Sequence, residues 1–127
     1  MTSVSRRDII WVSFPDQNEI PPEEFDNPHP AIVIQNNSDN NSLDSTVVVP
    51  LTTNQNGEVR LLTDVRVSAA TEDIDEDSTA KLNLLSSVSV PGRIFDEGEN
   101  EGAWKIGEIS PTKMTEIENK LEVLLGL

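Results

Sequence analysis

The sequence predicts one mostly β domain that ends in an α-helix, a small barrel-like α+β fold. Three observations predict it. Short apolar runs of strand length recur along the chain, polar turn-rich segments separate them, and only the C-terminal segment has helical periodicity. The 127 residues suffice for one hydrophobic core but not for two, so we expect a single domain over residues 1–127.

The first expected strand covers residues 8–14, D-I-I-W-V-S-F, and follows a flexible polar tail over residues 1–7. Branched and aromatic side chains favour a strand in this run. Its large apolar ring makes Trp11 an expected core residue. Residues 15–28 then form a proline-containing acidic loop. A loop of this length in a small domain is either functional or disordered.

Residues 29–53 predict a strand pair and the first candidate site. Two apolar runs, residues 31–34 and 47–51, flank a loop of Asn, Ser and Asp. A hairpin brings its outer ends together. The only histidine, His29, is therefore expected near the hydroxyls of Thr52 and Thr53.

The middle of the chain predicts further short strands. Asn56-Gly57 is a strong hairpin signal. Residues 58–62 and 65–67 are strand candidates after it. We expect residues 69–77 to form a solvated acidic loop.

Within this loop, the spacing of Asp73, Asp75 and Asp77 resembles the start of a calcium-binding loop. Such a loop needs glycine at its sixth position and glutamate at its twelfth. Ser78 and Leu84 stand there instead. We therefore expect no metal site.

The last third predicts one or two strands over residues 81–90, a break at Pro91-Gly92, an acidic turn over 96–102 and a strand over 104–109. A helix follows. It has Ser110 as N-cap, Pro111 in its first turn, Gly126 as its left-handed end, and an apolar stripe of Met114, Ile117, Leu121 and Leu124.

The net charge of −14 restricts the classes of partner. Nucleic-acid binding at ordinary ionic strength normally relies on Lys and Arg. An acidic surface of this kind also suits a saline cytoplasm. Cysteine is absent, which excludes disulfides and thiolate chemistry. No apolar run approaches the roughly 20 residues of a membrane helix, and no signal peptide is evident, so we expect a cytoplasmic protein without a cofactor.

Several blocks together resemble the MazF/PemK family of toxins. They are D-I-I-W-V-S-F, H-P-A-I-V-I-Q-N-N, V-V-V-P-L-T-T and the terminal S-P-x-K-M-x-E-I-E-N-K-L-x-x-L-L-G-L, in the family's order and spacing. The resemblance implies an SH3-like or CcdB-like barrel with a C-terminal helix, a homodimer, and a metal-independent endoribonuclease of single-stranded RNA. It also implies an antitoxin as partner.

The resemblance also implies site residues. Thr52 matches the family's catalytic threonine, and His29 stands where the family has arginine. Lys81 and Asn83 align with an Arg and an Asp of some members, and with Thr53 they are the implied RNA-binding residues. The family's glycine before the first strand is here Arg7. Neutral histidine lacks arginine's permanent charge and planar fork, but it exchanges a proton near neutral pH and suits acid–base work.

Three hypotheses follow. The first is a ribonuclease toxin with an atypical site at His29 and Thr52. The second is a toxin-fold protein that acts by binding a protein, as the related gyrase-poisoning CcdB toxins do through a region that corresponds to residues 104–127. The third is a catalytically inactive toxin kept as an antitoxin-binding module. In all of them His29 could also be a plain surface residue at a strand entrance.

Overall fold

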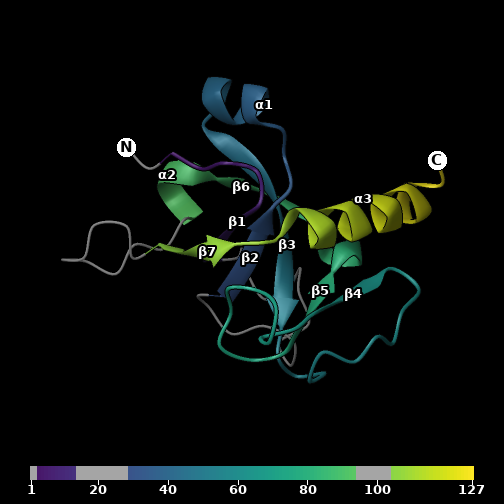
Figure 1. Ribbon diagram of the computed structural model, residues 1–127. Coiled ribbons are helices and arrows are strands. Elements are labelled where there is room, and N and C mark those ends of the chain that lie inside the picture. The colour runs from purple at the N-terminus through teal and green to yellow at the C-terminus, as the bar shows by residue number, and fades with distance from the viewer. Residues whose placement is uncertain (1–2, 14–28, 94–103) are drawn as a thin grey trace.

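The computed structural model describes residues 3–13, 29–93 and 104–127. The described strands form one curved antiparallel sheet, a half-barrel, with a long helix across one face (Figure 1). The strands are β1 (Asp8–Val12), β2 (His29–Val33), β3 (Ser45–Thr52), β4 (Asp64–Val67), β5 (Ser78–Lys81), β6 (Ser86–Ser89) and β7 (Lys105–Glu108). The helices are α1 (Asn37–Ser42), α2 (Val90–Arg93) and α3 (Pro111–Leu125), with a 3-10 turn, η1 (Leu82–Leu84). The predicted mostly β domain with a C-terminal helix is confirmed.

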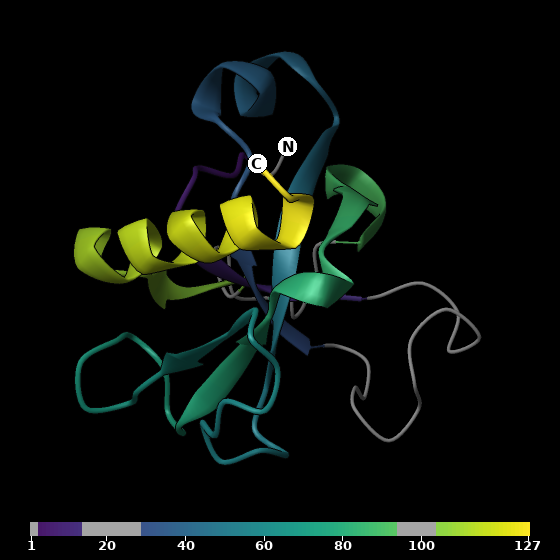
Figure 2. The ribbon, with the colours of Figure 1, turned by 90° about the vertical axis from the view of Figure 1, so that its right-hand side faces the viewer.

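The sheet has the order β4-β5-β3-β2-β1-β7, and β6 also pairs with β3. The long strand β3 is its centre. The first half of β3 pairs with β6, and its last residues, Leu51 and Thr52, pair with β5. Because two different strands share one edge of β3, the sheet bends there. Figure 2 shows α3 lying across the bent sheet.

Strand alternation divides the core into two clusters on opposite faces of the sheet. One face carries Val4, Ile10, Val12, Ala31, Val33, Val48, Val88 and Val90. The other carries Ile9, Ile32, Val49, Leu51, Val65, Val67, Ala80, Leu82, Ile109, Met114 and Ile117. We call these the open face and the helix face, because α3 packs only on the second. The two faces of β2 and β3 therefore have different surroundings.

The predicted pairing of residues 31–34 with 47–51 is confirmed, with Ile32 opposite Val49. The predicted polar loop between them contains the short helix α1, which Asn36 caps by accepting a hydrogen bond from the Asp39 amide. The residues of α1 are polar and none of them is buried, so the Asn36 cap, which satisfies an amide of the first turn, supports this helix.

The prediction of a strand over residues 58–62 is wrong. Asn56 and Gly57 do adopt the left-handed backbone of a tight turn, with φ of 53° and 79°. However, the chain after them forms turns and no strand, and the edge of β3 is taken by β5 instead. The turn at Asn56-Gly57 was therefore predicted correctly, but the strand that pairs with the end of β3 was not.

Other predicted elements are confirmed with shifted bounds. Residues 65–67 lie in β4 and residues 104–109 contain β7. Residues 81–90 contain the end of β5, η1 and β6. Pro91-Gly92 lies within the short helix α2. The predicted loop over 15–28 and the predicted turn over 96–102 lie outside the described residues.

The N-terminal segment is packed where the structure describes it. Val4 is buried in the open-face cluster. Arg7 donates its amide to the Val33 carbonyl and its Nε to the Ile109 carbonyl. Residues 3–7 of the expected flexible tail are thus part of the domain.

The C-terminal helix begins and ends as predicted. The Ser110 side chain accepts a hydrogen bond from the Lys113 amide, and Gly126 has a φ of 71°. Met114 and Ile117 are buried against the sheet, and Leu121 and Leu124 are partly buried beside them. No helix among the described residues is long and apolar enough to cross a membrane.

The acidic segment between β4 and β5 is a fixed strap. Glu72 accepts hydrogen bonds from the amide and hydroxyl of Ser110, at 2.7 and 3.0 Å. Asp73 accepts one from the Glu108 amide at 3.1 Å. The predicted acidic loop is confirmed and stays largely exposed, but its carboxylates also satisfy backbone donors at the edge of β7 and the start of α3. We call residues 68–77 the strap.

Candidate functional site

His29 and Thr52 lie in one transverse row on the open face. Ala31 pairs with Pro50, and the strands extend to His29 and Thr52, so the same register places these two residues opposite each other. Alternation puts both side chains on the face that carries Ala31 and Val48. Opposed residues of antiparallel strands have Cα atoms about 4.5–5.5 Å apart. The hairpin therefore brings the histidine to the threonine, as the sequence predicted.

The same row continues across the sheet in both directions. His29 pairs with Val12 on β1. Thr52 pairs with Thr79 on β5, and Thr79 pairs with Arg66 on β4. Sequence reasoning missed Thr79 and Arg66, because their place in the row depends on which strand borders β3.

The hydroxyls in the row are held by the chain that follows β3. Thr52 is 2% exposed, and its Oγ1 accepts a hydrogen bond from the Asn54 amide at 3.2 Å. Thr79 is fully buried and donates to the Glu58 carbonyl at 2.9 Å. His29 is half-buried. The row thus combines an imidazole with hydroxyls of fixed orientation.

The Lys81 side chain does not project to solvent. Its Nζ lies 2.9 Å from Asp64 Oδ1, with 5% and 0% of the two side chains exposed. It also donates to Gln55 Oε1 at 3.1 Å. The charge that aligns with a family arginine is therefore neutralised inside the domain.

Asp64 is the anchor of the loop between β3 and β4. Burial by itself raises the pKa of Asp64. Hydrogen bonds from Lys81, from the amides of Leu61 and Arg60, and from Gln55 outweigh it and hold that pKa below its ordinary value. The carboxylate is thus kept ionised as the partner of Lys81.

The remaining predicted site residues lie apart from this row. Asn83 is exposed on η1. Thr53, one residue beyond Thr52, lies on the helix face and lines a cavity there. The structure brings together His29 and Thr52, but not Lys81 or Asn83.

That cavity has a volume of about 130 Å³ and lies between the sheet and the strap. Trp11, Pro30 and Leu51 form its apolar wall, and Ile74 of the strap faces them. Trp11 was expected in the core but is only half-buried. It lies on the helix face at the end of β1, beyond the reach of α3, so its ring lines the cavity instead.

Positive charge near the row is scarce among the described residues. Arg66 is the cation at its β4 end, with 59% of its side chain exposed. Its guanidinium lies 3.3 Å from Asp77, and its aliphatic stem lies against Gly57. An exposed pair of this kind contributes little stability, so the guanidinium exchanges partners readily.

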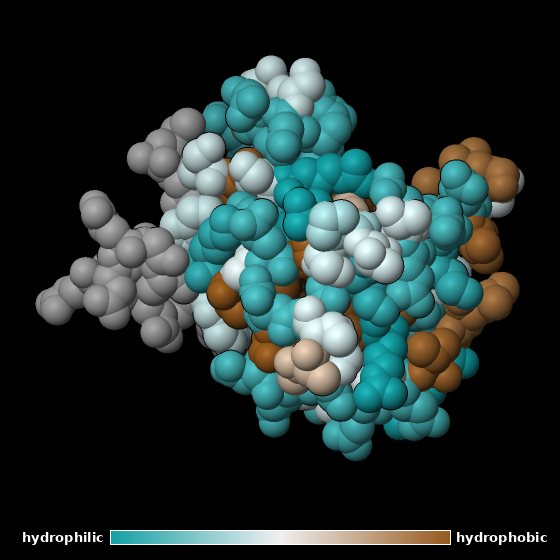
Figure 3. Space-filling view, in the orientation of Figure 1, coloured by the Kyte–Doolittle hydropathy of each residue, from teal (hydrophilic) through white to brown (hydrophobic). Residues whose placement is uncertain are grey.

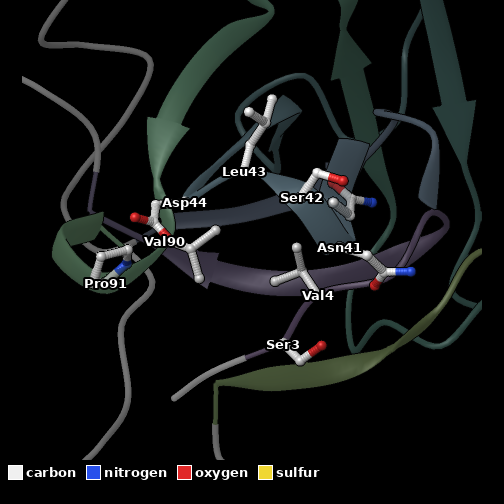
Figure 4. Close-up of a pocket in the computed structure, with 9 residues that line it drawn as sticks. Ser3, Val4, Asn41, Ser42, Leu43, Asp44, Val90 and Pro91 are labelled. Atoms are coloured by element: carbon white, nitrogen blue, oxygen red, sulfur yellow. The ribbon is translucent and has the colours of Figure 1, made fainter. Parts of the chain in front are cut away.

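A second cavity, of about 160 Å³, lies at the other end of β3. Figure 4 shows it between the N-terminal residues Ser3 and Val4, the end of α1 and the start of α2. It contains no titratable side chain except that of Asp44. Within the described part of the chain, no three His, Cys, Asp or Glu side chains are grouped to hold a metal ion.

Comparisons with solved structures find the same fold at low sequence identity. MazF from Deinococcus radiodurans matches with a TM-score of 0.72 and 17% identity, covering 100% of both chains. An endoribonuclease in complex with its cognate antitoxin from Mycobacterial species matches with a TM-score of 0.71 and 18% identity, covering 98% of this chain and 96% of that one. The Mycobacterium tuberculosis toxin MazF-mt6 matches with a TM-score of 0.68 and 17% identity, covering 95% and 98%.

The sequence itself supplies the family. A comparison with curated proteins found no match. The family model described as the PemK-like, MazF-like toxin of type II toxin–antitoxin systems matches residues 5–125, nearly the whole chain. The half-barrel and the C-terminal helix are those of the solved MazF structures. The chain belongs to the PemK-like, MazF-like toxin family.

Proposed function

We propose that this chain is the toxin of a type II toxin–antitoxin pair and that it cleaves single-stranded RNA without a metal ion, at His29 and Thr52. The observation that carries the proposal is the register that sets these two residues opposite each other on the open face. The family match and the endoribonuclease among the structural neighbours support it.

The chemistry needs few groups. The RNA 2′-hydroxyl attacks the adjacent phosphorus, and the 5′-oxygen leaves. A base must take the hydroxyl proton, an acid must protonate the leaving oxygen, and donors must stabilise the phosphorane. His29 takes the 2′-hydroxyl proton, and the imidazolium so formed gives a proton to the leaving 5′-oxygen, while the Thr52 hydroxyl donates to a phosphate oxygen. Lys81 plays no direct part, because its charge is held by Asp64.

The test is incubation of the protein with a long single-stranded RNA and EDTA, at low and at molar salt. We expect cleavage that is lost in His29→Ala and Thr52→Ala. Thr112→Ala, which removes an exposed hydroxyl on α3, is the matched control and should cleave normally. RNA that stays intact with the wild type at every salt concentration would refute the enzyme proposal.

The proposed partners are an antitoxin and a second copy of the chain, in the cytoplasm where RNA is available. A neighbour of this fold is an endoribonuclease held by its cognate antitoxin. Figure 3 shows apolar residues gathered around the end of α3, where Val123, Leu125 and Leu127 are exposed. This apolar surface supports self-association. Sedimentation of the wild type should give a dimer, and Leu125→Glu should shift it to a monomer.

A non-catalytic role is the second candidate. The net charge of −14 and the neutralised Lys81 favour a protein partner over RNA at low salt. The discriminating measurement is growth inhibition by the His29→Ala/Thr52→Ala double variant. Loss of toxicity supports the ribonuclease, and retained toxicity supports action by binding.

A further inference from the structure

We propose that the cavity between the strap and the sheet binds a single RNA base, with guanine preferred over uracil. This proposal rests on the proposed ribonuclease function, because it names how the same site would select its substrate. The walls of the cavity come from β1, β2, β3, β5, β7 and the strap.

The position of the cavity is the first argument. Trp11 pairs with Pro30, and the β2–β3 register places Leu51 level with Pro30, so one row on the helix face forms the wall. Pro30 and Leu51 directly neighbour His29 and Thr52 in the chain. The cavity and the candidate catalytic pair therefore lie one residue apart, on opposite faces of the same sheet end. An RNA strand whose phosphate lies at His29 and Thr52 can pass around this end of the sheet and place an adjacent base in the cavity.

The shape is the second argument. A volume of about 130 Å³ is well below the roughly 300–1,000 Å³ of pockets for whole small ligands. It suits one planar ring system. Single-stranded RNA is commonly recognised by unstacked bases placed against aromatic side chains, and such stacking contributes about 1–3 kcal/mol per base. Trp11 is half-buried and supplies that surface.

The rim chemistry is the third argument. Asp75 and Glu76 of the strap line the cavity and are exposed. An ionised carboxylate only accepts hydrogen bonds. Guanine presents two adjacent N–H donors on its Watson–Crick edge, which match the two oxygens of one carboxylate. Uracil presents a single N–H between two carbonyl oxygens, which the carboxylate repels. Thr53 adds a hydroxyl for the acceptors of the base.

The strap keeps this rim in place. Asp73 lies in the notch left by Gly107, where an added Cβ would meet the Asp73 Cβ at 2.3 Å. Glu72 accepts a hydrogen bond from Ser110, and Asp73 accepts one from Glu108. These two anchors directly precede the rim carboxylates in the chain. The carboxylates are therefore carried by a segment fixed to the domain at its preceding residues.

The test uses short 2′-O-methyl oligonucleotides, which lack the nucleophile and cannot be cleaved, so binding is measured without catalysis. The chain has two tryptophans, and Trp104→Phe leaves Trp11 as the only indole. We expect oligo(G) trimers to quench Trp11 fluorescence in a saturable way, at least tenfold more tightly than oligo(U) trimers. Glu76→Gln with Asp75→Asn should abolish this preference. Glu122→Gln with Glu118→Gln removes the same charge from α3 and should preserve it.

Three outcomes would overturn the proposal. The first is no quenching by any trimer. The second is that all trimers bind with the same affinity and that replacing Asp75 and Glu76 strengthens the binding of every trimer to the same extent. The two carboxylates would then only repel phosphate. The third is saturable quenching by the tripeptide Lys-Leu-Lys but not by the trimers, which would make the cavity a protein-docking site. Guanine-selective binding in a protein that leaves RNA intact would uphold the pocket and refute the enzyme.

Discussion

Lys81 and Asp64 form an ion pair of 2.9 Å inside the domain, where 5% and 0% of their side chains are exposed. They face each other across β5 and β4, as register partners. Through Gln55, Arg60 and Leu61, the Asp64 carboxylate also holds the loop that begins directly after Thr52 and Thr53. The buried ion pair therefore helps to fix the loop that follows the candidate site.

Lys81→Met is expected to lower the free energy of unfolding by about 3–5 kcal/mol, because it leaves the Asp64 carboxylate buried without its cation. Urea denaturation measures this. The matched control is Lys113→Met, since Lys113 is also paired with a carboxylate, that of Glu116, but 47% of the glutamate side chain is exposed. Its loss should cost much less. Similar losses for both variants would show that burial of the Lys81 pair has no special effect.

The Lys81–Asp64 pair also predicts a pH dependence. The pKa of Asp64 in the folded protein is held below its ordinary value. The stability from its ionised form is therefore complete above that value and is lost as pH falls through the lower, folded pKa. Asp64→Asn should destabilise the protein at neutral pH, and the difference from the wild type should shrink in acid. Urea denaturation from about pH 7 to about pH 3 follows this. A constant difference would contradict the assignment.

Arg7 occupies a backbone conformation that favours glycine, with a φ of 82°. A glycine would adopt this conformation without strain. Arg7→Gly removes the left-handed strain but also the hydrogen bond from Nε to the Ile109 carbonyl. Arg7→Ala removes the same side chain and hydrogen bond but keeps the Cβ and therefore the strain. We therefore expect the glycine variant to be more stable than the alanine variant by about 1 kcal/mol in denaturation experiments. Equal stability would mean that the backbone strain is absent.

Gly107→Ala tests the strap. Its new Cβ would lie 2.3 Å from the Asp73 Cβ, so the strap must move. We expect a loss of about 1–3 kcal/mol in unfolding free energy, as for overpacking, together with a changed Trp11 emission in the Trp104→Phe background. Asp73→Ala still carries that Cβ, so the combined variant should remain destabilised, whereas Asp73→Gly should restore stability in part. Gly126→Ala, which has no neighbour within 4 Å, should leave Trp11 emission unchanged.

The local elements were largely predictable from short-range patterns. The apolar stripe and caps defined α3, because Ser110, Pro111 and Gly126 act within one turn of chain. The apolar runs defined the β2–β3 pair and hence the approach of His29 to Thr52. Asn56-Gly57 was correctly a turn, but its expected second strand did not form. β5 pairs with the end of β3, where a hairpin strand after Asn56-Gly57 would have paired.

The functions of charged residues were less predictable. Lys81 resembles an RNA-binding cation in the sequence, yet Asp64, distant in the chain, buries it. Asp73 and Asp77 resemble solvated carboxylates. However, Asp73 holds the Glu108 amide, and Asp77 holds the Ala69 amide and the Arg66 guanidinium. The sequence shows which residues are charged, but the partner of each charged side chain depends on which strands lie side by side.

The family, the mostly β class, the terminal helix and the nearness of His29 to Thr52 were predictable from the sequence. These follow from patterns of nearby residues and from blocks in a recognisable order. The same patterns did not show that Lys81 is neutralised, that Arg66 and Thr79 share the row of Thr52, or that Trp11 lines a cavity beside the strap. Those facts depend on the order β4-β5-β3-β2-β1, which brings together residues far apart in the chain. His29 and Thr52 could be placed from sequence because one hairpin contains both, whereas their surroundings belong to the whole sheet.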